Sequence, residues 1–432
     1  MSASASAPSP TNQRGTRREE LAWAMYDWAS SAWSTLQITV VVSYLTGAVI
    51  PGREGPLVYS LGISITMFFA AILSPIIGAL ADARANKRSW LIAATCLGAG
   101  SAILMGATPT EWPWLVAAFF FLTNFGFELC WGIYNGFLPE IADDQSMNRV
   151  SAWGFAFGYV GGALALIVAL VIVLNPAALG LSKSDAARLA IASMGVWWFV
   201  FSLPAFLILR DKLTPTMAPR SVRAEAAAAM AKVWQTLLNL RRYGTLSLFL
   251  LGFLFYNDGM QTVITQASVF AQDVLKMETD ELIKVILMVQ FVSLPGALLV
   301  GKLSDWIGAK TTLHINLAIW VALVISAFFV NTREQFWIMA AILALVMGGA
   351  QSVSRAIMGF MTPEKHAGEF MGFFNLSGRA VSMLGPMVFG ITNYFTGSAH
   401  IAIVSLLIFF VVGWALITPV NIQRGKQQAG KA

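Results

Sequence analysis

The sequence predicts an all-α membrane protein with twelve transmembrane helices in two six-helix bundles and with both termini in the cytoplasm. Three observations lead to this fold class. Of the 432 residues, 57% are hydrophobic and only 12% are charged, whereas about a quarter are charged in soluble domains. The apolar residues form long segments separated by short polar loops. Short patterns in the first half of the chain recur in the second half, which is typical of carriers built from an internal repeat.

Twelve apolar segments approach or exceed the ~20 residues that a helix needs to cross a bilayer. They lie at 21–48, 57–81, 89–107, 112–138, 150–174, 187–209, 245–270, 281–301, 311–330, 335–359, 368–394 and 398–419. The chain is therefore expected to divide into a disordered cytoplasmic tail, an N-terminal bundle, a cytoplasmic linker, a C-terminal bundle and a second tail. The corresponding ranges are 1–20, 21–211, 212–243, 244–420 and 421–432.

The distribution of Lys and Arg sets the expected orientation, because cytoplasmic loops carry an excess of basic residues. With the amino terminus inside, 20 of the 28 basic residues fall in the cytoplasm, six fall outside, and Arg355 and Arg379 lie within apolar segments. The basic residues are scattered over short loops. The net charge of +6 therefore indicates membrane orientation and not nucleic-acid binding.

The linker contains apolar residues at helical spacing, flanked by basic residues. The apolar set is Met230, Val233, Trp234, Leu237 and Leu238. This pattern predicts an amphipathic helix on the cytoplasmic membrane surface that connects the bundles. A helix that binds a partner protein is the alternative.

A loop pattern occurs at equivalent places in the two halves. Gly301–Lys310 follows G-x-L-x-D-x-x-G-x-K, and an incomplete copy spans Gly78–Arg88. Small residues let two helices approach closely, and an Asp at a helix end can face the amino terminus of the next helix. We expect Asp82 and Asp305 to pair with neighbouring basic residues and so to close the cytoplasmic side in the outward-open state. The gating candidates are Gly78, Asp82, Lys87, Arg88, Gly301, Asp305, Gly308 and Lys310.

Charged residues inside apolar segments are the first candidates for a functional site, since each costs about 2.5–3.5 kcal/mol at the middle of a membrane. At ~1.5 Å per residue, Glu128, Asp258 and Arg379 lie near the middle of their segments, with Asp27 and Arg355 shallower. We expect the three deep charges to face one aqueous cavity. Arg379 would hold a substrate carboxylate, and the acids would take part in proton coupling. The alternative is that Arg379 only neutralises an acid across the bundle interface.

Uncharged polar residues accompany these charges on the first, fourth, seventh, tenth and eleventh segments. An interhelical hydrogen bond worth roughly 0.6 kcal/mol explains any one of them, but their concentration on these segments favours a polar path. The candidates for substrate binding or coupling are Tyr26, Asp27, Glu128, Tyr134, Asn135, Asp258, Gln261, Gln351, Arg355, Asn375 and Arg379.

Four glycines in the fifth segment, Gly154, Gly158, Gly161 and Gly162, are interpreted as a surface for tight helix packing. Cys96 and Cys130 both lie in apolar segments, and the three histidines are far apart. They offer no disulfide framework or metal-ligand spacing. No nucleophile with its base is evident either, so we expect neither a cofactor nor a metal and do not expect an enzyme.

The two loop patterns resemble the signature of the major facilitator superfamily, in which segments 1, 4, 7 and 10 line the central cavity. Further stretches resemble one branch of it, the autophagy-type vacuolar effluxer-like family. They are Trp23–Trp33, Tyr134–Glu140, Val150–Gly162, Phe255–Thr262, Gly348–Arg355 and Glu369–Phe374. The family usually has Asn where Ser30 or Ser31 stands.

The resemblance implies a monomeric secondary active transporter that moves a small polar organic solute, with amino acids as one class, by alternating access. Proton or other ion coupling and a bacterial inner (plasma) membrane location go with this interpretation. A transport-inactive receptor or scaffold and a transporter of drugs or lipids are the alternatives.

Overall fold

A computed structural model describes residues 15–84, 86–142, 147–211, 243–362 and 382–430, together with isolated positions between 224 and 234. The described part is helical and carries no β-strand. Arg379, Asn375 and most of the linker lie outside it, as do the side chain of Asp82 and most of the eleventh apolar segment.

The first half consists of six long helices. They are α1 (Arg17–Leu36) with its π-helical continuations η1 (Gln37–Val41) and η2 (Tyr44–Val49), α2 (Glu54–Arg84), α3 (Lys87–Ala107), α4 (Pro113–Ile141), α5 (Met147–Leu174) and α6 (Lys183–Ile208), with a short turn η3 (Ala177–Leu179) before α6. The α1 helix begins before the predicted boundary at residue 21. Thr16 and Glu19 form a capping box there, in which each side chain accepts a backbone N–H of the other residue.

The second half repeats this arrangement. Its helices are α8 (Gly244–Leu275), α9 (Thr279–Ile307), α10 (Ala309–Ala327), α11 (Arg333–Met361), α13 (Leu384–Thr396), α14 (Ala399–Ser405), α15 (Leu407–Ile417) and α16 (Ile422–Gln428). Gly308, at a φ of 89°, separates α9 from α10. The predicted tail at 421–432 contains α16, whose Gly425 packs on Met361 at the end of α11.

Nine helical segments of the described residues are long and apolar enough to cross a membrane. They account for the predicted segments one to six, nine, ten and twelve. The α8 and α9 helices have 32 and 29 residues but are not among the nine, and α8 carries Asn257 and Asp258 near its middle. Twelve crossings and cytoplasmic termini remain predictions.

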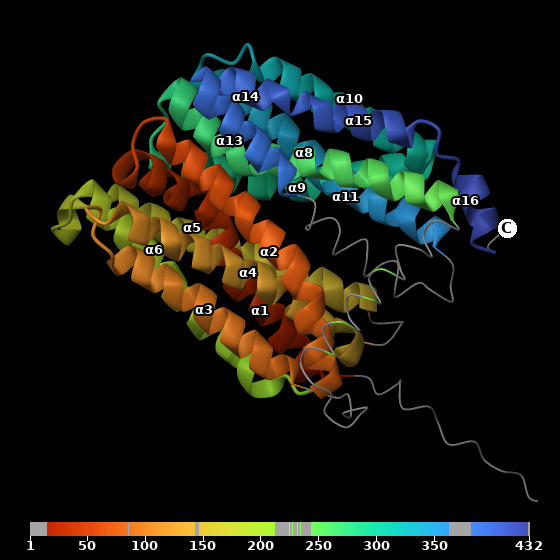
Figure 1. The fold of residues 1–432 in the computed structure, drawn as a ribbon, viewed down its shortest axis with the longest axis horizontal. Coiled ribbons are helices and arrows are strands. Elements are labelled where there is room, and N and C mark those ends of the chain that lie inside the picture. The colour runs from red at the N-terminus through yellow and green to blue at the C-terminus, as the bar shows by residue number, and fades with distance from the viewer. Residues whose placement is uncertain are drawn as a thin grey trace, which may run out of the picture.

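The two halves form separate bundles whose helices run along the length of the molecule. Figure 1 shows the red-to-yellow first half and the green-to-blue second half in two layers, with the carboxyl terminus at one end. Gly15 donates its N–H to the carbonyl of Ile141, which places the start of α1 beside the end of α4. We call the end that carries Gly15 and α16 the terminal end, and the opposite one, with the α1–α2 and α8–α9 connections, the distal end.

The glycines of α5 allow α1 to pack closely on it. A Cβ atom on Gly161 would lie 2.5 Å from the carbonyl oxygen of Trp28, and one on Gly154 would lie 2.6 Å from the ring of Trp23. Gly158 faces Ser31 and Asp27 in the same way. The packing interpretation is confirmed, and this contact fixes the face of α1 that remains open to the second half.

Candidate functional site

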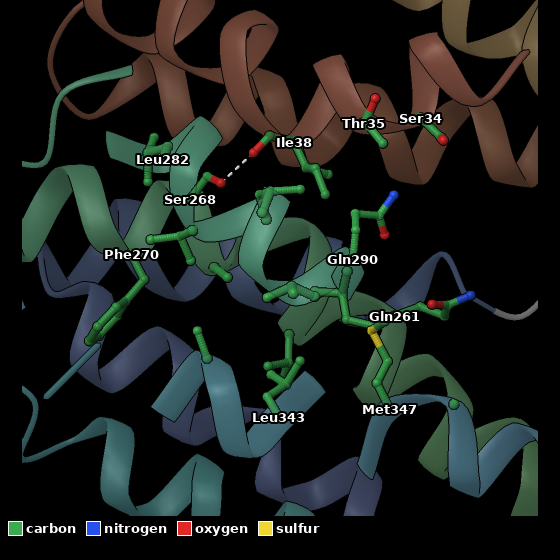
Figure 2. A pocket seen from close by; sticks show the side chains of 18 of the residues that line it. Ser34, Thr35, Ile38, Gln261, Ser268, Phe270, Leu282, Gln290, Leu343 and Met347 are labelled. Carbon is green, nitrogen blue, oxygen red and sulfur yellow. Dashed lines mark hydrogen bonds between the residues drawn. The ribbon is translucent and has the colours of Figure 1, made fainter. Parts of the chain in front are cut away.

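A cavity of about 340 Å³ lies between the two halves. The first half contributes residues of α1, α4 and α5, and the second half contributes residues of α8, α9, α10, α11 and α14. Figure 2 shows α1 with Ser34 and Thr35 on one side of the space, and Gln261, Gln290 and Met347 facing it from the second half. Ligand sites commonly have volumes of ~300–1,000 Å³, so this cavity suits a small solute.

One wall of the cavity is a row of polar side chains on α1. The row comprises Asp27, Ser30, Ser31, Ser34 and Thr35. The hydroxyls of Ser34 and Thr35 both donate to the carbonyl oxygen of Ser31, each at 3.0 Å. Because these hydroxyl protons are already used within the helix, the oxygen atoms are left to accept hydrogen bonds from a bound molecule. The α1 wall is therefore rich in acceptors.

Three glutamines complete the polar part of the site. Gln261 comes from α8, Gln290 from α9 and Gln351 from α11. Each amide supplies two donors and a carbonyl acceptor. A Cβ atom on Gly162 of α5 would lie 3.4 Å from Nε2 of Gln290, so this amide lies where the two halves meet. The amide N–H groups can donate to acceptor groups of a solute, whereas the hydroxyl oxygens of Ser34 and Thr35 are left to accept from its donor groups.

Hydrogen bonds close the space at the distal end. The Gln272 amide donates to the hydroxyl of Ser43 and accepts from that of Thr46, the latter at 3.1 Å. Ser60 donates to the carbonyl of Gln266 at 3.1 Å, and Ser268 donates to the backbone carbonyl of Ile38. These hydrogen bonds between the two halves all lie at the distal end.

The loop between α1 and α2 adds a cation to this closure. The guanidinium of Arg53 packs on Gly397, where a Cβ atom would lie 2.7 Å from one of its nitrogens. Gly397 has a φ of 65° and ends α13. A positive charge at this position is favourable because the carbonyls at a helix carboxyl terminus carry partial negative charge.

The predicted gating residues lie in the turns at the terminal end. Lys87 pairs with Glu140 and donates to the carbonyl of Gly136, and its own N–H donates to the carboxylate of Asp211 at 2.7 Å. Lys310 donates to the carbonyl of Thr418 at 2.8 Å. These contacts stay within one half each.

The remaining gating residues that the structure describes show no contact between the halves, and the side chain of Asp82 lies outside the described part. Asp305 is exposed and forms no ion pair within the described part of the chain. Arg88 is half-buried, and a Cβ atom on Gly78 or Gly301 would meet nothing within 4 Å. The pairing of Asp82 and Asp305 with neighbouring basic residues, which is expected in the outward-open state, remains a prediction.

Of the predicted site residues, Asp27, Gln261 and Gln351 line the cavity. Tyr26 and Tyr134 are buried behind it, in a stack whose ring centroids are 5.2 Å apart. The hydroxyl of Tyr26 bonds to that of Thr95 at 2.8 Å. Asn135 donates to the carbonyl of Trp131 on its own helix. These three residues support the helices around the cavity.

Other predicted site residues are not among the residues that line the cavity, and these include Glu128 and Asp258. The expectation that the deep charges share one cavity remains a prediction. On α4, Phe127 and Trp131 line the cavity, and Glu128 is not among its lining residues. Arg355 is exposed near the end of α11. Asn375 and Arg379 lie outside the described residues.

Asp258 is fully buried and forms the cap of α13 instead. The N–H of Gly385 donates to both of its carboxylate oxygens at 3.1 Å. Thr262 places its hydroxyl beside the same carboxylate. A carboxylate is a favourable partner for the exposed N–H groups at a helix amino terminus, which explains why this acid turns toward α13 and away from the cavity.

Three residues outside the predicted set also line the cavity, namely Ser34, Thr35 and Gln290. Gln290 stands alone among apolar neighbours from Val285 to Val292, and this isolation is a signal that could have identified it. Ser34 and Thr35 follow the Ser30–Ser31 pair by one helical turn, so they share its face of α1.

Two helical bundles with a cavity between them are the arrangement of the major facilitator fold. A D-xylose–proton symporter has the same fold, with a TM-score of 0.70 over 93% of this chain and 97% of that one at 14% identity. The nucleoside transporter NupG aligns with a TM-score of 0.66 over 92% and 97% of the two chains, also at 14% identity. Likeness at this level of identity shows the fold alone.

The chain belongs to the Atg22-like vacuole effluxer family, whose model matches residues 58–430. The uncharacterized MFS-type transporter YxiO of Bacillus subtilis (strain 168) is 30% identical over 407 residues, which cover 93% of this chain and 94% of YxiO. Autophagy-related protein 22 of Cryptococcus neoformans is 27% identical over 304 residues, or 65% of this chain and 52% of that protein. The chain thus spans about half the length of this fungal relative. The predicted family is confirmed.

Proposed function

We propose that the protein is a secondary active transporter that carries a small polar organic solute across a membrane by alternating access. The observation that carries the proposal is the cavity between the halves, which combines the acceptor-rich wall of α1 with the amides of Gln261, Gln290 and Gln351. Sites of this kind lie at the interface of the two repeats in such transporters. Amino acids are one solute class with the necessary donors and acceptors.

The position of the hydrogen bonds between the halves supports a conformation in which the cavity opens toward the terminal end. The distal end is closed by the Gln272, Gln266 and Ser268 hydrogen bonds between the halves. With the termini in the cytoplasm, as the Lys and Arg distribution predicts, this is the inward-facing state. Release of the distal hydrogen bonds and approach of the halves at the terminal end would give the outward-facing state.

Asp27 is the candidate for proton coupling. It lines the cavity, is only 7% exposed, and contacts the surface where Gly158 brings α5 onto α1. A carboxyl group there changes its preferred protonation state when a solute or water enters the cavity. The coupling roles predicted for Glu128 and Asp258 remain predictions.

Two measurements test the proposal. Purified protein is screened by thermal shift against amino acids, nucleosides and sugars, because a solute that binds only the folded state raises its stability. Transport of each hit is then measured in proteoliposomes with and without a proton gradient, for the wild type, Asp27→Asn and Gln290→Leu. We expect saturable uptake by the wild type and loss of this uptake in Gln290→Leu. Binding without transport would indicate a receptor, and binding restricted to apolar compounds would indicate a drug or lipid transporter.

A further inference from the structure

Beyond the glutamines, the cavity extends into an apolar chamber inside the second half. Its walls include Phe270 of α8, Leu282 of α9, Val324 of α10, and Phe336, Ala340 and Leu343 of α11. All six are at most 8% exposed. Figure 2 shows Phe270 and Leu282 at one end of the space and Gln261 and Gln290 at the other. The chamber is therefore a blind extension of the polar site.

The positions along the helices separate the polar and apolar regions. On α8, Gln261 precedes Phe270 by nine positions, or about 13 Å at 1.5 Å per residue. On α11, which runs the other way, Phe336 and Leu343 precede Gln351. Both helices thus place the amide toward the terminal end and the apolar residues toward the distal end. The separation is a property of the bundle and not of one side chain.

The chamber offers water few partners. Ser268 lies at its edge, but its hydroxyl proton is donated to the carbonyl of Ile38. A buried water needs two to four polar partners, and cavities lined by Leu, Ile and Phe stay dry while accepting small apolar molecules. The chamber therefore favours an apolar group over water.

We infer that this chamber binds the apolar tail of the transported solute while the α1 hydroxyls and the three amides bind its polar head. The inference rests on the proposed function and narrows its substrate class to small amphipathic solutes with one apolar tail. The whole cavity, at about 340 Å³, holds such a molecule with its tail toward the distal end. A sugar or polyol, which is polar on all sides, would leave hydroxyls unpaired against Phe270 and Leu343.

The test uses two homologous series that differ in the head group. One series runs from glycine through alanine and norvaline to norleucine, and the other from 1,2-ethanediol to 1,2-hexanediol. Binding to the full-length protein in lipid nanodiscs is measured by thermal shift and by calorimetry. In at least one series each added methylene is expected to tighten binding about fourfold, the transfer value for one buried methylene, until the chamber is full.

Two substitutions change the chamber in opposite directions. Ala340→Leu shortens it, so the gain per methylene should stop at a shorter tail than in the wild type. Leu343→Ala enlarges it, so the gain should continue to a longer tail. Ile342→Ala, on the same helix at a side chain that is 41% exposed, is the matched control and should keep the wild-type limit. If Ala340→Leu does not fold, the comparison of Leu343→Ala with Ile342→Ala still decides the question.

The outcomes separate the two proposals. Binding that is independent of tail length, or a limit that Leu343→Ala does not move, would overturn the chamber assignment and leave the transporter proposal intact. Binding of sugars and polyols in preference to both series would also overturn the chamber. Failure of every amino acid, diol, nucleoside and sugar to bind the wild type would contradict the proposed function and the chamber with it.

Discussion

The cap that Asp258 provides for α13 gives a quantitative prediction. Asp258→Ala removes the acceptor of the Gly385 N–H, which contacts both carboxylate oxygens at 3.1 Å. A hydrogen bond to a charged group contributes about 1.5–3 kcal/mol, and a buried charge at a helix terminus adds up to ~2 kcal/mol. Because these contributions overlap, we expect Asp258→Ala to lower the free energy of unfolding by about 2–4 kcal/mol. Asp258→Asn keeps one oxygen and should cost about half as much.

The assay is unfolding of the purified protein by SDS in mixed micelles, followed by tryptophan fluorescence. The control is Asp280→Ala, which breaks an exposed pair with Lys284 four residues away and should cost at most ~0.5 kcal/mol. If Asp258→Ala were no more destabilising than Asp280→Ala, the capping account would be refuted.

The same site predicts compensation between two substitutions. A Cβ atom on Gly385 would lie 1.9 Å from the hydroxyl oxygen of Thr262 and 2.8 Å from Oδ1 of Asp258. Gly385→Ala should therefore destabilise the fold by about 1–3 kcal/mol, the usual range for overpacking. Thr262→Ala removes the nearer clash, so the double variant should recover part of this loss. A double-mutant cycle with no coupling energy would contradict the geometry.

Three further predictions concern the first half, the distal closure and the cavity. Gly126→Ala should lower the free energy of unfolding by about 1–3 kcal/mol, because the added Cβ atom would lie 2.6 Å from the backbone of Gly98. The control is Gly100→Ala, whose Cβ atom would meet nothing within 4 Å. This variant should be neutral or stabilising in the same unfolding assay. Gln272→Ala should open the distal end and increase labelling of an introduced Ala267→Cys by an impermeant maleimide from that side; unchanged labelling would count against the closure. Gln290→Leu should weaken solute binding at least tenfold by calorimetry, while Ile342→Ala should leave it unchanged.

Much of the fold was accessible from the sequence because lipid imposes a strong pattern on it. Long apolar segments and the two loop copies predicted the helical repeat, and the Gly154–Gly162 spacing predicted the packing of α5 on α1. Helix boundaries were less accessible, since they depend on local caps such as Thr16 and Glu19. The start of α13 at Leu384 was not predicted either, because it relies on a carboxylate more than 120 residues away.

The site was predicted less well than the fold because depth in a membrane does not determine which way a side chain faces. Next to Glu128, Phe127 lines the cavity, and Asp258 accepts the N–H of Gly385. The energetic cost of burial identifies charged residues as site candidates but does not identify neutral ones. Gln290 and Thr35 line the space yet cost little to bury, so no energetic argument singled them out. Facing direction follows from packing, which needs the three-dimensional structure.

The placement of the hydrogen bonds between the halves at one end has a mechanical consequence. Under the alternating access proposed above, the halves would hinge at this distal seam for as long as its hydrogen bonds hold. Each bundle would then move as a lever arm whose length is set by helices such as α8, with 32 residues or about 48 Å. A rotation of about 10° around such a pivot displaces the far end by roughly 8 Å. That is enough to admit a solute of the size the cavity holds. The hydroxyl and amide groups that join the halves at the distal end can exchange their hydrogen-bond partners for water. The distal end can therefore reopen without unfolding a helix.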